Sequence, residues 1–207
     1  MKTYLTKTPK LIKELFPNYV WDLNNGENVL HLSFDDGPHP KITPWVLNML
    51  EKFNAKASFF CVGENITKYS EIHKEIQYQD HVVGNHTFNH LNGWKTNTKM
   101  YLENVKKADL VINNNNGLFR PPYGKIKTKQ AKYLLKNGYK IIMWDILSGD
   151  FDHNLNKVQC LQNIIKNTQK GSIIVFHDSE KAFDKLQYVL PKALEFFSKK
   201  GFVFKVV

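Results

Sequence analysis

The stretch VLHLSFDDGPHP, residues 29–40, decides the class of fold. Its apolar, β-branched and aromatic residues at 29–34 predict a short buried strand, and the polar turn DDG follows at once. Thr-Pro at 43–44 then supplies the cap and first turn of a helix that we expect over 43–53. A buried strand followed by a helix is the unit from which parallel sheets are built.

The same alternation continues to the end of the chain. Further strands are predicted at 57–62, 81–85, 118–119, 139–145, 172–177 and 202–206, and further helices at 69–79, 98–112, 128–137, 158–167 and 183–198. Short continuous apolar strands suit a parallel sheet covered by helices on both faces, so a small (β/α) barrel is favoured. An open doubly wound sheet is the alternative, but no glycine-rich phosphate-binding turn follows the first strand.

Length and composition indicate one soluble domain. At 207 residues the chain suits a single core, which we place at 28–207, with 1–27 as a leading helix and loop packed on the barrel. No apolar run reaches the roughly 18 residues of a membrane span, and no signal-peptide pattern is visible, so a cytoplasmic location is expected, with cell-envelope association as the alternative. No pattern favours a particular oligomeric state.

The net charge of +10 is spread over scattered lysines. No stripe of arginines and aromatic residues marks a nucleic-acid-binding face, so the charge predicts solvation and no nucleic-acid partner. Of the 29 basic residues only Arg120 is an arginine, which suggests a position that needs a planar, bidentate fork. Cys61 and Cys160 are expected as buried thiols.

Ionisable side chains follow five of the predicted strands. In parallel barrels the active site lies at the C-terminal ends of the strands, so we expect these groups on one rim. They are Asp35 and Asp36, His86 and His90, Arg120, Asp145 and Asp150, and His177 with Asp178.

The pair HxxxH at His86 and His90 suggests a metal site. Two histidines four apart can face one way on a helical turn, and a carboxylate from another strand completes three ligands with a position left for water. This pattern predicts one divalent metal ion, Zn²⁺. Of two adjacent aspartates after a strand, one can ligate the metal while its neighbour stays free as a base.

A second histidine site is expected at His177. This side chain could protonate a leaving group, with Asp150 orienting its ring and keeping it charged. Arg120 could hold the free aspartate ionised.

Five segments in order resemble the motifs of the polysaccharide deacetylases, the NodB homology domain family also called carbohydrate esterase family four. They are SFDDGPHP at 33–40, GNHTFNH at 84–90, FRPPYG at 119–124, WDILSGDF at 144–151 and IIVFHD at 173–178. The resemblance covers 28–207 and implies a distorted (β/α)7-type barrel with parallel strands and outer helices.

The resemblance also implies a role for each matching residue. It makes Asp35 the general base, Arg120 its partner, and His177 the general acid supported by Asp150. It makes Asp36, His86 and His90 the metal ligands, gives Tyr123 an oxyanion-binding N–H, and places Pro122, Phe151 and Val175 along the substrate pocket. The family often has Trp where this chain has Phe151 and Leu where it has Val175, which puts the substrate preference in question.

The expected function is metal-dependent removal of N-linked acetyl groups from an N-acetylglucosamine-containing carbohydrate, either a chitooligosaccharide or a peptidoglycan-like chain. An O-acetyl esterase acting on xylan-like chains, or a small-molecule amidase, could use the same site. A catalytically dead carbohydrate-binding protein would lack the base, a ligand or the acid, and all of these are present.

Overall fold

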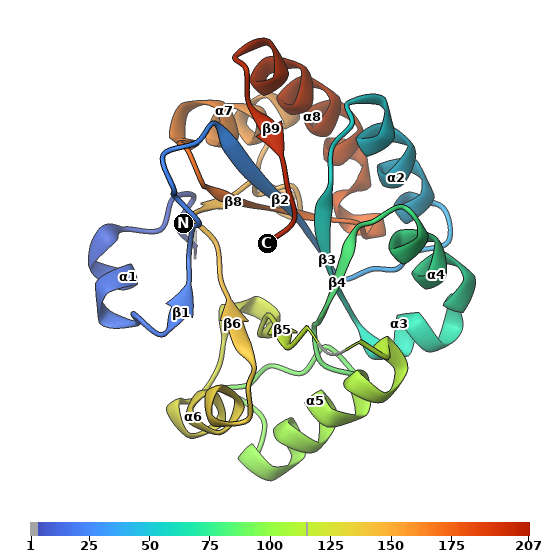
Figure 1. Cartoon of the computed structure of the whole chain (residues 1–207), viewed down its shortest axis with the longest axis vertical. Helices are drawn as coiled ribbons and strands as arrows, with labels where there is room; N and C mark the ends of the chain where they lie inside the picture. The colour runs from blue at the N-terminus through green and yellow to red at the C-terminus, as the bar shows by residue number, and fades with distance from the viewer. Residues whose placement is uncertain (1–3, 115) are drawn as a thin grey trace.

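Figure 1 shows the computed structural model, which describes residues 4–114 and 116–207. The sheet runs in the order β1-β6-β5-β4-β3-β2-β8-β7, every pairing along it is parallel, and β9 pairs with β2. The strands are β1 (Tyr19–Val20), β2 (Val29–Asp35), β3 (Ala57–Cys61), β4 (Val82–Asn85), β5 (Leu118–Phe119), β6 (Lys140–Ile142), β7 (Ile146–Leu147), β8 (Ile173–His177) and β9 (Val203–Phe204). The expected distorted barrel of parallel strands is confirmed.

Helices surround the strands on the outside (Figure 1). They are α1 (Lys10–Leu15), α2 (Ile42–Lys52), α3 (Gly63–Lys68), α4 (Ser70–Tyr78), α5 (Thr98–Ile112), α6 (Thr128–Lys136), α7 (Lys157–Asn167) and α8 (Glu180–Lys199), with a 3₁₀ turn, η1, at Pro122–Gly124. Every residue of β2 and β3 is buried, and Phe34 stacks between Phe59 and Phe176. Burial on both faces explains why these strands read as continuous apolar runs.

The strand predicted at 139–145 is wrong as a single element. The strand β6 ends at Ile142. The chain then crosses from one end of the sheet to the other, where the next strand, β7, pairs with β8. In the crossing segment the Met143 N–H donates to Val20 O (2.7 Å), and the Asp145 N–H donates to Ile173 O (3.0 Å). The sequence is apolar throughout this segment because it closes the barrel, but the segment does not form one continuous strand.

The segment before residue 28 contains α1 and also contributes β1, which lies parallel to β6. The Lys13 ammonium lies 2.6 Å from both Asp22 and the buried Asp145, so an ion pair fastens α1 to the barrel. The prediction for residues 1–3 lies outside the described residues. Among the helices that are described, none has the length and apolarity to cross a membrane.

Candidate active site

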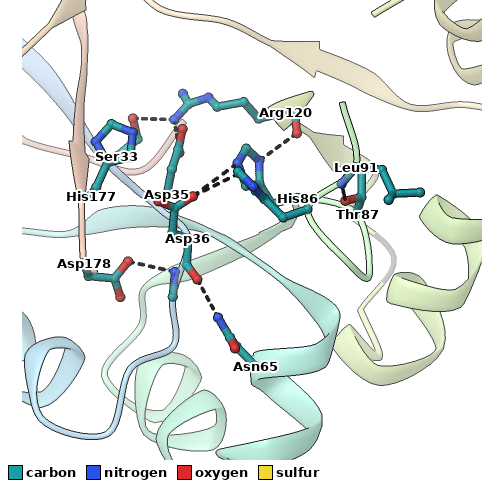
Figure 2. A network of polar contacts seen from close by, with 12 residues as sticks. Ser33, Asp35, Asp36, Asn65, His86, Thr87, Leu91, Arg120, His177 and Asp178 are labelled. Atoms are coloured by element: carbon teal, nitrogen blue, oxygen red, sulfur yellow. Dashed lines mark hydrogen bonds and ion pairs between the residues drawn. The ribbon is translucent and has the colours of Figure 1, made fainter. Parts of the chain in front are cut away.

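A pocket of about 280 Å³ opens at the C-terminal ends of the strands. It is lined by Tyr4, Asp35, Asp36, His86, His90, Tyr123, Lys125, Trp144, Leu147, Phe151, Val175, His177, Ser179 and Lys181. Sheet register explains part of this convergence, since Asp35 and His177 end β2 and β8 as direct neighbours. Figure 2 shows the polar groups that meet there.

Asp35 is held by Arg120, whose side chain is completely buried. The Arg120 Nη1 donates to Asp35 Oδ1 at 2.6 Å and to Ser33 Oγ at 2.8 Å (Figure 2). The other guanidinium nitrogens donate to the carbonyls of Ile142 (3.1 Å) and Met143 (3.0 Å). The expected bidentate fork on the aspartate is therefore wrong: one nitrogen contacts it, and the remaining donors serve the barrel wall.

Asp36, His86 and His90 form a second group, whose three potential ligand atoms lie within 4.8 Å of one another. Asp36 Oδ1 is 3.1 Å from His90 Nε2 and 3.8 Å from His86 Nε2. The Nδ1–H of His86 donates to Arg120 O at 2.8 Å, so the neutral ring keeps its Nε2 lone pair for the pocket.

The charges of this group suit a divalent cation. Burial lowers the pKa of His86 to about 4, which keeps the imidazole neutral. Burial raises the pKa of Asp36, but the hydrogen bond from His90 and the nearby His177 and His86 outweigh it and hold that pKa well below its usual range. Two imidazole nitrogens and one carboxylate are a donor set that fits a catalytic metal with an open position.

The backbone that carries this group is irregular. His86 and His90 follow β4 in a loop, so the expected helical turn is wrong. Thr87 (φ 62°), His90 (φ 53°) and Asp36 (φ 83°) all adopt the left-handed region. Thr87 is held from both sides, since its N–H donates to Asn85 Oδ1 at 2.7 Å and its hydroxyl accepts from the Leu91 N–H at 3.0 Å. Such conformations cost about 1–3 kcal/mol each and are typical of functional sites.

His177 forms the third group with Asp150, which is completely buried. One carboxylate oxygen accepts from His177 Nδ1 and the other from its backbone N–H, both at 2.8 Å. Burial lowers the pKa of His177, but the carboxylate of Asp150 outweighs this and raises it to about 9. The ring is therefore a charged imidazolium at neutral pH.

Apolar and aromatic side chains also line the pocket. Leu147 and Val175 are register neighbours on β7 and β8, and the Phe151 ring lies 5.0 Å from that of His177. Tyr4, with its ring 5.1 Å from Phe151, was missed by sequence reasoning because nothing in the N-terminal segment distinguishes it. Trp144, Lys125, Ser179 and Lys181 also line the pocket without having been predicted.

The predicted residues of η1 are placed differently from one another. Tyr123 lines the pocket, with its ring 4.7 Å from His90 and its backbone in the left-handed region at φ 61°. Pro122 is buried and is not among the lining residues.

Two of the aspartates expected on the rim have structural partners instead. Asp145 accepts from Lys13 and from Ser172 Oγ, each at 2.6 Å. Asp178, labelled in Figure 2, accepts from the Gly37 N–H at 3.0 Å. It also accepts from the Thr43 hydroxyl. A Cβ at Gly37 would lie 2.1 Å from Asp178 Oδ2, which explains the glycine of the DDG turn.

Comparison with known proteins gives consistent matches. The family model described as polysaccharide deacetylase matches residues 22–142. A peptidoglycan-N-acetylglucosamine deacetylase of Bacillus cereus is 33% identical over 170 residues, which are 78% of this chain but only 62% of that relative. A second Bacillus cereus protein of the same name is 31% identical over 210 residues, 95% of each chain. The crystal structure of a peptidoglycan N-acetylglucosamine deacetylase in complex with 4-naphthalen-1-yl-N-oxidanyl-benzamide has a TM-score of 0.83 at 29% identity, covering 97% of this chain and 95% of that one.

Proposed function

Since the chain belongs to the polysaccharide deacetylase family, we propose that it is a metal-dependent hydrolase that removes N-linked acetyl groups from an N-acetylglucosamine-containing carbohydrate. The observation that carries this proposal is the convergence of three groups on one pocket: a metal-binding triad, a buried aspartate held by an arginine, and a charged histidine held by an aspartate. The names of the relatives support a glycan substrate of the peptidoglycan kind.

Asp36, His86 and His90 would hold one divalent cation, and we propose Zn²⁺ because imidazole and carboxylate donors suit it. When bound, such an ion polarises an acyl carbonyl and lowers the pKa of water.

Asp35 is proposed as the general base. It lies beside Asp36 in sequence, but its carboxylate contacts Arg120 while that of Asp36 faces the two histidines. The Arg120 guanidinium holds the Asp35 carboxylate in place, and a carboxylate can accept a proton from the attacking water. We assign the backbone N–H of Tyr123 to the developing oxyanion, because this residue lines the pocket beside His90.

His177 is proposed as the general acid. Its Nδ1 contacts Asp150, so Nε2 is the nitrogen left to protonate the departing amine. An amine anion is a very poor leaving group, whereas an alkoxide from an ester needs the proton less. A histidine kept charged by a buried carboxylate therefore supports amide cleavage over ester cleavage.

Acetate release tests the proposal directly. The chain, loaded with Zn²⁺, is expected to release acetate from N-acetylglucosamine oligomers or peptidoglycan fragments, and a chelator should abolish the release. The double variant His86→Ala, His90→Ala should lose both the metal and the activity. Acetate from acetylxylan alone would identify an O-acetyl esterase, and glycan binding without acetate release would identify a binding protein.

A further inference from the structure

The N-terminal segment reaches the pocket and supplies one of its walls. Residues 6–8 lie along the free edge of β7: the Leu147 N–H donates to Thr6 O at 2.8 Å, and the Thr8 N–H donates to Asp145 O at 2.9 Å. Lys7 and Ile146 form an antiparallel bridge in the same place. These backbone bonds fix the segment and bring Tyr4 to the pocket.

The Tyr4 side chain is held at both its ring and its hydroxyl. The ring packs against Phe151 at 5.1 Å and 54°, and the hydroxyl donates to Asp152 Oδ2 at 2.7 Å. Burial and Asp152 raise the pKa of Tyr4, so the phenol stays neutral and remains a donor. A Cβ at Gly149 would lie 3.0 Å from the Tyr4 hydroxyl, so the backbone at Gly149 packs closely against that hydroxyl.

Tyr4 lies with the apolar side chains of the pocket. Phe151, which it contacts, lies against His177, while Leu147 and Val175 are neighbours across β7 and β8. If the carbonyl of the substrate faces the metal-binding triad, as the proposed function requires, the alkyl part of the acyl group must be received by apolar side chains. Besides Tyr123, which lies beside His90, the apolar or aromatic lining residues available for this are Tyr4, Trp144, Leu147, Phe151 and Val175, and Tyr4 contacts Phe151 directly.

We propose that Tyr4 is a specificity-determining residue, whose ring forms the wall of the pocket beside Phe151 and limits the acyl group accepted there to acetyl. This inference rests on the proposed function. The wall is rigid because the segment that carries Tyr4 is bonded to β7 and the hydroxyl is bonded to Asp152. A longer acyl chain would have to displace a ring that is fixed at two points.

The test compares kcat/KM for glucosamine oligomers carrying N-acetyl, N-propionyl or N-butyryl groups. In Tyr4→Ala we expect the ratio of butyryl to acetyl kcat/KM to rise at least about tenfold, since one methylene in an apolar pocket is worth roughly 10–200-fold. Tyr4→Phe keeps the ring on Phe151 but loses the bond to Asp152, so its ratio should lie much closer to that of the wild type than to that of Tyr4→Ala. Tyr19→Ala removes an aromatic ring from the same N-terminal segment outside the pocket, and should also leave the ratio unchanged.

The outcomes separate this inference from the proposed function. A wild-type protein that releases no acyl group from any of these amides overturns the proposed function, and the inference with it. An active wild type whose Tyr4→Ala variant loses activity on all three substrates in proportion shows that Tyr4 only stabilises the fold. Should Tyr4→Ala not fold, as judged by thermal unfolding, Tyr4→Leu opens the same wall with a smaller loss of apolar contact and carries the same comparison.

Discussion

Replacing Asp150 by Asn tests the pair that holds the His177 imidazole. Burial lowers the pKa of His177, while the Asp150 carboxylate raises it, and the result is a change from 6.5 to about 9. This pKa shift favours the imidazolium by about 3 kcal/mol, since each pKa unit corresponds to about 1.4 kcal/mol. In Asp150→Asn the charge and one of two acceptors are lost. Burial is then opposed only by Asp36 and Asp35, and we expect the pKa of His177 to fall towards its ordinary value of 6.5.

The same shift predicts how the free energy of unfolding depends on pH. A histidine whose folded pKa is raised contributes stability that is fully present below pH 6.5 and is lost as the pH rises through about 9. The wild type should therefore have a higher free energy of unfolding than Asp150→Asn. This difference should be larger below pH 6.5 than above pH 9. The extra difference should be about 3 kcal/mol.

NMR titration of the His177 ring in metal-free protein measures the pKa, with His177→Gln used to assign the resonance. Urea unfolding of the wild type and Asp150→Asn across the same pH range measures the free energies. A pKa near 9 in Asp150→Asn, or a difference in unfolding free energy that does not change with pH, refutes the reasoning.

Further variants probe the other groups. Asp35→Asn should abolish acetate release but keep the metal, whereas Asp36→Asn should lose metal affinity first, as metal analysis and turnover on the same preparations will show; the reverse result would exchange the two roles. Arg120→Lys should lower both turnover and the urea midpoint, with a stability loss of about 2 kcal/mol or more, because an ammonium cannot reach the backbone carbonyls that the guanidinium satisfies. Lys13→Met should cost roughly 1–3 kcal/mol of unfolding free energy, because it leaves the buried Asp145 only Ser172 and the more distant Lys7 ammonium at 3.7 Å, and adding Asp145→Asn should recover part of the loss.

Most of the barrel was predictable because its strands are buried on both faces. The runs at 29–34, 57–62 and 172–177 became β2, β3 and β8 with nearly the predicted bounds. The strand β1 was missed because Tyr19–Val20 is too short to show a period, and it forms only because β6 offers a free edge. Helix α3 was missed for a similar reason, since its six residues between β3 and α4 carry almost no helical pattern.

The site was predictable in its residue types but not in its geometry. The resemblance brought Asp36, His86 and His90 into one group, and the structure places them together. Spacing alone suggested a helical turn for the histidines, because sequence does not reveal that Thr87 and His90 adopt left-handed backbone conformations. Asp145 was predicted on the rim because the sequence does not reveal its ion pair with Lys13, a residue far away in the chain.

Arg120 connects the two halves of the site through different parts of the same residue. Its guanidinium contacts Asp35, while its carbonyl oxygen accepts the Nδ1–H of His86 and so fixes the tautomer of that ring. A change in the backbone at this position would disturb the base and a metal ligand together. During evolution, therefore, a substitution at residue 120 cannot change proton transfer without also changing metal affinity. A single mutation at this position can remove both.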